Sequence, residues 1–238
     1  MRKGTLLIGC LGLVAASLFA VNGAAAAQRT PLSPARLVTI TIPARPGQIP
    51  AKWLSYPGPP RANVLLPAGY DPDRRYPLLV LLNGLSNNYA SYAADGIVAM
   101  LETYGLDAIV VMPEGASGWY ADWWNGRGPG TPAWETYELD TVLPTVLARY
   151  PVLPQRRYHA LAGFSMGGLG ATYLGGRLPG FFGSVATLSG FVDTQYFAPV
   201  TAPGMGLVSL APLEGDYNVY PVYGAPYGSY SDGHNPTL

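Results

Sequence analysis

One stretch, residues 158–170, restricts the fold of this chain more than any other. Its apolar first half is typical of a buried strand, and the part from Met166 onward is typical of a helix. Between them lies the pattern G-x-S-x-G, formed by Gly163, Ser165 and Gly167. Sterics explain the glycines, because a serine in a sharp strand-to-helix turn leaves no room for side chains two positions away. The pattern predicts a serine hydroxyl presented at the end of a strand. The alternative, in a chain with 30 glycines, is a Gly-rich turn without chemistry.

Strand-like and helix-like segments alternate on both sides of this turn. The expected strands are 36–42, a short edge strand at 52–55, 62–67, 78–82, 108–112, 158–162 and 183–189, and the expected helices are 89–104, 134–150 and 166–178. Pro144 interrupts the second helix and is expected to kink it. The alternation predicts an α/β fold, with a mostly parallel sheet and helices on both faces. In such sheets the ligand site lies at the carboxyl ends of the strands.

The N-terminus has the features of a secretory signal peptide. Two basic residues precede an apolar run over 6–21, and alanines at 25–27 offer a cleavage site. We therefore expect a signal peptide at 1–27, one domain at 28–238, and a protein that is secreted or associated with a bacterial-type cell envelope, without a stable membrane span after cleavage. The alternatives are an uncleaved anchor and, more weakly, a lipoprotein modified at Cys10.

Composition excludes several functional classes. The 14 basic and 14 acidic residues balance, and removing the two basic residues of the signal leaves 12 against 14, a net charge of −2. Such a chain has no electrostatic footprint for nucleic acid. The single cysteine lies in the signal, so no disulfide is expected in the exported protein. Two histidines and no mature cysteine give no zinc motif, and no phosphate-binding G-x-x-x-x-G-K occurs. We expect neither a metal nor a cofactor.

A set of short motifs in a fixed order carries a family resemblance. They lie at 81–85, 111–115, 120–123, 134–137 and 163–168, and a tail at 223–226 and 235–236 continues the series. With these motifs the chain resembles the secreted esterase and acyltransferase branch of the α/β-hydrolases. It is most similar in look to the antigen 85 mycolyltransferases and more distantly to S-formylglutathione hydrolases (the esterase D-like branch). The resemblance implies a serine hydrolase or acyltransferase acting on a small-molecule or lipid acyl ester.

The resemblance also assigns residues to roles. Ser165 corresponds to the nucleophile that accepts the acyl group, and the backbone N–H groups of Leu85 and Met166 correspond to the oxyanion hole. That chemistry needs preorganised donors, because the oxyanion of the tetrahedral intermediate has to be stabilised as it forms. The alternative for Leu85 and Met166 is that they are ordinary apolar residues of the core or rim.

Five further residues are expected to line the substrate cleft. Asn83 and Ser86 stand where the mycolyltransferases carry an Asp and an Arg at their sugar site, so the resemblance does not extend to trehalose recognition. Trp119, Asp122 and Trp123 follow the next strand and are expected beside them. The alternative for this loop is an aromatic cover over the sheet.

The rest of the catalytic triad has no matching position. In α/β-hydrolases the order is Ser, then an acid, then His. In this branch both partners lie beyond the motif at 235–236, and the given chain ends at Leu238. His159 is expected to be structural, His234 lies where the family does not place its base, and Asp193 has no histidine to orient.

Two hypotheses follow from this departure. The chain is the record of a serine esterase whose last strands are missing, with an open sheet edge, or it is a catalytically inactive secreted binding or structural protein.

Overall fold

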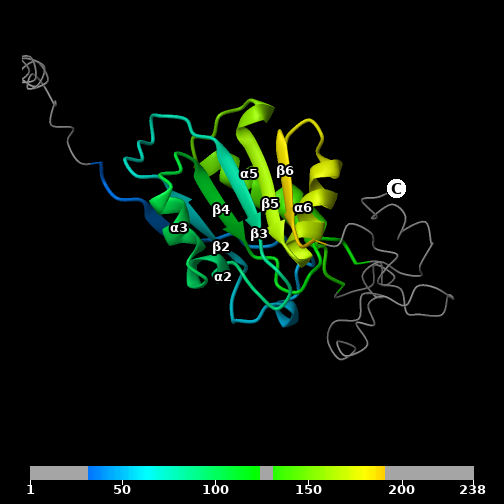
Figure 1. Cartoon of the computed structure of the whole chain (residues 1–238). Helices are drawn as coiled ribbons and strands as arrows, with labels where there is room; N and C mark the ends of the chain where they lie inside the picture. The colour runs from blue at the N-terminus through cyan, green and yellow to red at the C-terminus, as the bar shows by residue number, and fades with distance from the viewer. Residues whose placement is uncertain (1–31, 124–130, 191–238) are drawn as a thin grey trace, which may run out of the picture. The chain divides into compact units, whose positions relative to one another are not determined.

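The structure is a computed structural model that describes residues 32–123 and 131–190, all of whose helices and strands belong to the unit Pro34–Leu238. The predicted signal peptide, and the predicted irregular segment from residue 191 onward, lie outside the described residues. The sheet shown in Figure 1 consists of β1 (Arg36–Thr41), β2 (Arg61–Leu66), β3 (Leu78–Leu82), β4 (Ile109–Pro113), β5 (His159–Phe164) and β6 (Ser184–Leu188).

The strands are arranged in the order β1-β2-β4-β3-β5-β6. β4, β3, β5 and β6 pair in parallel, whereas β1 and β2 pair antiparallel with their neighbours. The predicted α/β class with a mostly parallel sheet is therefore confirmed, with an antiparallel pair at one side. β6 is the last strand of the order within the described residues. All five of its residues are exposed.

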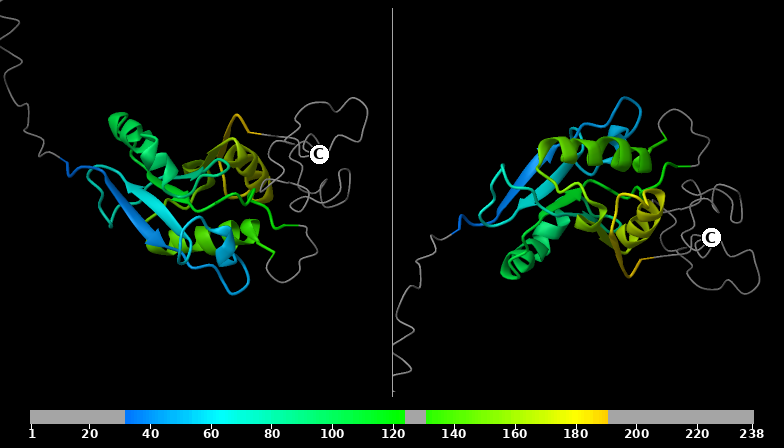
Figure 2. Two further views of the ribbon diagram at one scale, coloured as in Figure 1. Left: turned by 90° about the horizontal axis from the view of Figure 1, so that it is seen from below. Right: turned by 90° about the horizontal axis from the view of Figure 1, so that it is seen from above.

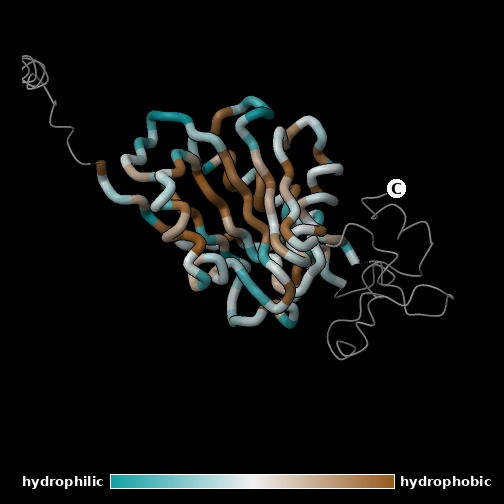
Figure 3. The backbone as a smooth tube through the Cα atoms, viewed as in Figure 1, coloured by the Kyte–Doolittle hydropathy of each residue, from teal (hydrophilic) through white to brown (hydrophobic). Residues whose placement is uncertain are grey.

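Helices cover both faces of the sheet, as Figure 2 shows. On one face lie α2 (Ser91–Ala94) and α3 (Ile97–Thr103), and on the other lie α4 (Trp134–Tyr137), α5 (Leu143–Arg149) and α6 (Met166–Arg177). β3 is apolar throughout because Leu78, Val80 and Leu82 face one core, while its two alternate residues pack in the other. Figure 3 shows these apolar strands in the interior. Within the described ranges, no helix has the length and apolar character needed to cross a membrane.

Two expected elements differ from the structure. The single helix predicted over 89–104 is broken into α2 and α3 at Gly96, whose φ of 79° is left-handed and ends one helix before the next begins. The prediction of a short strand over 52–55 was wrong. That segment instead contains a 3₁₀ turn, Ala51–Trp53, and its Trp53 packs against the main core.

The helix predicted over 134–150 is present but irregular. Between α4 and α5 lies a π turn, Glu138–Val142, and Pro144 stands at the start of α5. A proline has no N–H to donate to the carbonyl four residues before it, which here belongs to Asp140. The guanidinium of Arg45 donates to that carbonyl instead, with Nη2 2.7 Å from the oxygen. The predicted interruption of this helix is therefore present as a π turn, and Pro144 itself stands in the first turn of α5.

Candidate active site

Ser165 has the strained backbone that the sequence predicts for the turn. It connects β5 to α6 with φ 54° and ψ −117°, a conformation that residues other than glycine rarely adopt. Its N–H donates to the carbonyl of Leu188 at 2.8 Å, and its own carbonyl accepts from the N–H groups of Gly168 and Leu169 at 2.9 and 3.1 Å. These bonds from β6 and from the first turn of α6 hold the serine in this conformation. Its side chain remains partly exposed.

The two glycines of the motif are required by close packing. A Cβ on Gly163 would lie 2.1 Å from the carbonyl oxygen of Gly167, and a Cβ on Gly167 would lie 2.0 Å from the carbonyl oxygen of Leu82. Both distances are far below any van der Waals contact. The start of α6 therefore rests directly on the carboxyl end of β3, and this contact places Ser165 beside the segment that follows β3.

The segments of the two expected oxyanion donors lie next to Ser165. Met166 is fully buried and is the first residue of α6, where N–H groups have no partner inside the helix. Leu85 lies in the turn after β3 and packs against the main core. A Cβ on Gly84 would lie 3.3 Å from the ring of Phe164, the residue before the serine. The structure therefore brings the turn of Leu85 and the start of α6 to the same place.

Asn83, expected to line the substrate cleft, is buried and hydrogen-bonded within the protein. The residue is 2% exposed, and its side-chain amide uses all four of its hydrogen-bonding positions within the protein. Nδ2 donates to the carbonyls of Gly84 at 2.9 Å and Ala116 at 3.2 Å. Oδ1 accepts from the N–H of Gly115 at 3.1 Å and lies 3.0 Å from the hydroxyl of Tyr120. Asn83 instead joins the end of β3 to the loop 115–120.

The aromatic loop covers the sheet, which was the alternative to a cleft wall. Trp119 and Trp123 are 3% and 7% exposed and belong to the main core. The indole of Trp123 donates to the carbonyl of Gly118 at 3.0 Å and packs against Trp53, with ring centroids 4.5 Å apart. Burial of such large apolar rings favours the core over an open cleft.

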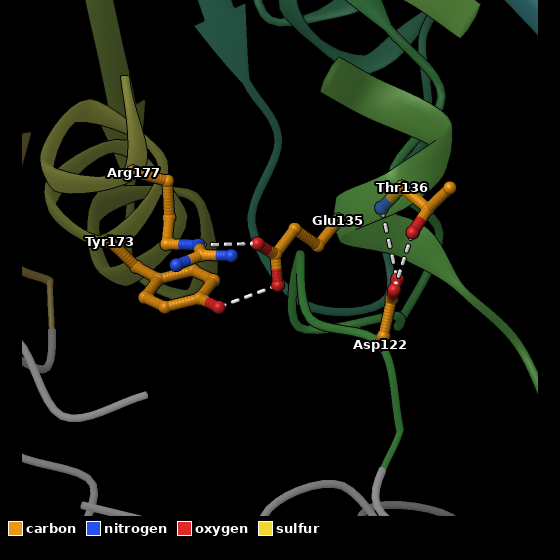
Figure 4. A network of polar contacts seen from close by, with 5 residues as sticks. All are labelled: Asp122, Glu135, Thr136, Tyr173 and Arg177. Carbon is orange, nitrogen blue, oxygen red and sulfur yellow. Dashed lines mark hydrogen bonds and ion pairs between the residues drawn. The ribbon is translucent and has the colours of Figure 1, made fainter. Parts of the chain in front are cut away.

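Of the two remaining cleft candidates, Asp122 is hydrogen-bonded to α4, whereas Ser86 is exposed. One carboxylate oxygen of Asp122 accepts the N–H of Thr136 at 2.9 Å and the other accepts the Thr136 hydroxyl, so Asp122 caps the first turn of α4 (Figure 4). Ser86 is exposed, with φ 62°, and its N–H donates to Oγ of Ser117 at 3.3 Å. Of the five expected cleft residues, Ser86 is the one whose side chain the structure places on the surface beside the serine turn.

The described part of the chain holds one histidine, His159, and it lies at the wrong end of β5. His159 is the first residue of β5, and Ser165 comes directly after the last. Six residues of extended chain separate the two by about 20 Å. His159 is 3% exposed, with Nδ1 3.0 Å from the carbonyl oxygen of Phe181 and Nε2 2.6 Å from that of Leu153. These contacts agree with the structural role expected for His159. His234 and Asp193 lie outside the described residues.

Two buried carboxyl groups beside the site were not singled out from the sequence. Glu114 follows β4 and is fully buried, and its Oε1 accepts the N–H of Ala116 at 2.7 Å. Burial raises its pKa, opposed by hydrogen bonds from Tyr56 and from the backbone of Ala116 and Tyr89. Burial raises the pKa of Glu138 well above its usual value, and the charge of Glu114 adds to that rise. Within the described ranges no three His, Cys, Asp or Glu side chains gather as metal ligands would.

A second polar group joins α4 to α6 on the same face of the sheet (Figure 4). One carboxylate oxygen of Glu135 accepts from Nε of Arg177 at 2.6 Å, and the other accepts from the hydroxyl of Tyr173 at 2.5 Å. Glu135 is 8% exposed, whereas the side chain of Arg177 is 57% exposed. The group fixes the C-terminal half of the helix that begins at the serine turn.

Comparison with known proteins identifies the family to which this geometry belongs. A family model described as "Putative esterase" matches residues 55–234, and the chain belongs to this esterase family. Over 134 residues it is 35% identical to Esterase Rv1288 of Mycobacterium tuberculosis (strain ATCC 25618 / H37Rv). That alignment covers 55% of this chain and 29% of the relative, so the chain spans less than a third of the length of this curated protein.

Solved structures of an esterase, a serine hydrolase and a mycobacterial protein are similar in fold to this chain. A ferulic acid esterase is 26% identical with a TM-score of 0.56, covering 68% of this chain and 63% of that one. The fluorophosphonate-binding serine hydrolase FphF of Staphylococcus aureus is 19% identical with a TM-score of 0.63, covering 86% and 72%. MPT51 (FbpC1) of Mycobacterium tuberculosis is 21% identical with a TM-score of 0.60, covering 84% and 67%. The resemblance to this branch of the α/β-hydrolases is thereby confirmed.

Proposed function

We propose that this protein is a serine esterase or acyltransferase that acts through an acyl-enzyme formed on Ser165. The observation that carries the proposal is the backbone of Ser165, held at φ 54° and ψ −117° between a parallel strand and a helix with both neighbouring glycines in close contact. A strained serine at this point persists only because the surrounding structure enforces it, and such strain is concentrated at functional sites. Membership of the esterase family supports the same conclusion.

The proposed reaction begins when Oγ of Ser165 attacks the carbonyl carbon of an ester. The carbonyl oxygen becomes an oxyanion, which accepts hydrogen bonds from the backbone N–H groups of Leu85 and Met166. Each such donor contributes about 10²–10³ in rate. Collapse of the tetrahedral intermediate expels the alcohol and leaves an acyl-serine. Water or a second alcohol then attacks the acyl-serine, which releases the acid or a new ester.

The proton of the serine hydroxyl has to pass to a base. His159 is the histidine of the described residues, and it lies at the far end of β5 with both ring nitrogens at main-chain carbonyls. Within the described residues, the histidine is therefore not placed to serve as the base. A serine without its base retains only the catalysis of the oxyanion hole and substrate binding, about 10³–10⁴ over water. Turnover through an acyl-enzyme on Ser165 therefore has to exceed this residual rate.

The substrate class we propose is an uncharged ester of a small molecule or an acyl lipid. Among the described residues, the segment after β3 presents the exposed side chain of Ser86 beside the serine turn, and the N–H of Ser86 donates to Oγ of Ser117. Export through the signal at 1–27 is part of the proposal. N-terminal sequencing of protein recovered from the culture medium or cell envelope is expected to begin at Gln28.

Hydrolysis of p-nitrophenyl acetate and p-nitrophenyl butyrate by the purified chain tests the proposal. We expect turnover above the buffer rate that is abolished in Ser165→Ala. The matched control is Ser184→Ala, which removes an exposed hydroxyl from the start of β6 and is expected to retain the wild-type rate. Equal rates in the wild type and Ser165→Ala would leave the second hypothesis, an inactive binding protein on the same scaffold.

A further inference from the structure

Tyr120 is a fully buried tyrosine in the loop that follows β4. It contacts both segments that carry the proposed oxyanion donors, the turn after β3 and the helix α6. Its hydroxyl lies 3.1 Å from the main-chain oxygen of Asn83 and 3.0 Å from Oδ1 of the same residue, so one hydrogen is shared between two acceptors. Burial raises the pKa of Tyr120 well above its usual value, so the hydroxyl keeps this hydrogen. Asn83 is two residues before Leu85, which carries one of the two proposed oxyanion donors.

The ring of Tyr120 packs against α6, which carries the other donor. A Cβ added to Gly170 would lie 2.4 Å from Cδ2 of the ring and 2.9 Å from Cβ of Tyr120, so the ring occupies the place of a side chain on the helix. Gly170 and Met166 are four residues apart and therefore share a face of α6. The residue before the tyrosine, Trp119, also contacts this face, because its N–H donates to Sδ of Met166 at 3.4 Å.

The backbone of this loop is held in an unfavourable conformation. Trp119 and Tyr120 have φ values of 59° and 54°, so two consecutive bulky residues occupy the left-handed region. Such conformations persist only where the surrounding contacts determine them. Here the contacts are those with Asn83 on one side and with the first turns of α6 on the other. The loop therefore joins the end of β3 to α6 beside their direct contact.

We propose that Tyr120 is a positioning residue that sets the separation between the Leu85 and Met166 N–H groups by bridging the end of β3 to α6. This inference rests on the proposed function, since it concerns the geometry of the same oxyanion hole. The two donors belong to different elements, and an oxyanion is stabilised only if both point at one position. The hydroxyl of Tyr120 bonds to the residue that follows β3, and its ring packs on α6. The bridge acts on catalysis through the two donors.

The test compares two tyrosine-to-phenylalanine variants of the full chain. Tyr120→Phe keeps the ring on α6 and removes the hydroxyl. We expect kcat for p-nitrophenyl acetate to fall about 10-fold or more, below the full loss of one donor, with KM within twofold of wild type. Tyr137→Phe is the matched control, because Tyr137 is equally buried and its hydroxyl donates to the carbonyl of Ile42 at 2.8 Å. It is expected to lose similar stability with kcat unchanged.

A rescue separates positioning from a general loss of packing. A variant with para-aminophenylalanine at position 120 restores a hydrogen-bond donor at the same place and is expected to recover most of the wild-type kcat. Wild-type kcat in Tyr120→Phe, or equal losses of kcat in Tyr120→Phe and Tyr137→Phe, would overturn the inference.

A second readout distinguishes failure of this inference from failure of the proposed function. If the wild type turns over no ester, the esterase proposal fails, but the bridge is still tested by the amide resonances of Leu85 and Met166 in ¹⁵N-labelled protein. We expect both to shift in Tyr120→Phe and neither to shift in Tyr137→Phe. Should Tyr120→Phe not fold, the same spectra of the para-aminophenylalanine variant are expected to match the wild type at both residues. Unchanged resonances in folded Tyr120→Phe, or shifted ones in the rescue variant, would contradict the bridge.

Discussion

Replacing Glu138 by Gln is expected to change how the stability of the protein depends on pH. Glu138 lies in the π turn between α4 and α5, is 3% exposed, and its Oε1 has no hydrogen-bond partner within the described residues. Burial first, and then the nearby charge of Glu114, raises the pKa of Glu138 well above its usual value. The folded protein therefore binds this proton more tightly than the unfolded chain does.

The sign and size of the effect follow from that difference. Between the pKa of Glu138 in the unfolded chain, about 4.3, and its raised pKa in the folded protein, the folded state carries one more proton. The free energy of unfolding therefore falls as pH rises through this window, by about 1.4 kcal/mol per pH unit. From pH 5 to pH 7 the wild type is expected to lose up to about 2.7 kcal/mol more than Glu138→Gln, a large part of a typical stability of about 5–15 kcal/mol.

Urea unfolding followed by tryptophan fluorescence at pH 5, 6 and 7 measures the effect. Glu138→Gln keeps the size of the side chain and removes the titration, so its curve of unfolding free energy against pH is expected to be flatter than that of the wild type. Glu102→Gln, which removes a carboxyl group from the exposed side of α3, is the control. It measures how the loss of an exposed acidic side chain changes the pH dependence of the unfolding free energy. Parallel curves for the wild type and Glu138→Gln would refute the reasoning.

Two further predictions concern the polar contacts of α4. Asp122→Ala removes the cap on Thr136 and is expected to cost about 1 kcal/mol in urea unfolding while kcat/KM stays within twofold of wild type, whereas a cleft residue would change kcat/KM first. Arg177→Met leaves the buried carboxylate of Glu135 without its cation. It is expected to cost about 1–2 kcal/mol, less than a fully buried pair because Arg177 is 57% exposed. The double variant with Glu135→Gln should recover part of that loss. If the unfolding free energies lost in the two single variants simply add up in the double variant, the pairing of Arg177 with Glu135 is contradicted.

The serine turn could be predicted because its cause is local. Gly163 and Gly167 are dictated by backbone atoms 2.1 and 2.0 Å from where a Cβ would lie, and those atoms belong to the turn itself and to the strand beside it. The apolar run of β3 was equally informative, since a strand covered on both faces has no polar alternation. The α/β class followed from these two features and from the alternation of strands and helices.

Residues whose role depends on distant segments could not be assigned in this way. A polar Asn83 after a central strand suggests a cleft residue, but its partners are in loop 115–120, whose path the sequence does not specify. Glu138 is four residues from the buried Trp134 and shares its face of the helix. That spacing was the available signal for burial, although a carboxyl group is ordinarily expected in solvent. The break at Gly96, by contrast, is local, since the glycine takes a left-handed φ of 79° between α2 and α3.

The central claim is that Ser165 is a nucleophile, and labelling with a fluorophosphonate probe tests it most directly. The hydroxyl oxygen of an activated serine attacks the phosphorus and displaces fluoride, and the enzyme keeps the phosphonyl group as a stable ester. Mass spectrometry of the digested full-length chain is expected to find that group on the peptide containing Ser165, and to find none in Ser165→Ala. Absence of the adduct from the wild type, or its presence on another residue, would contradict the account.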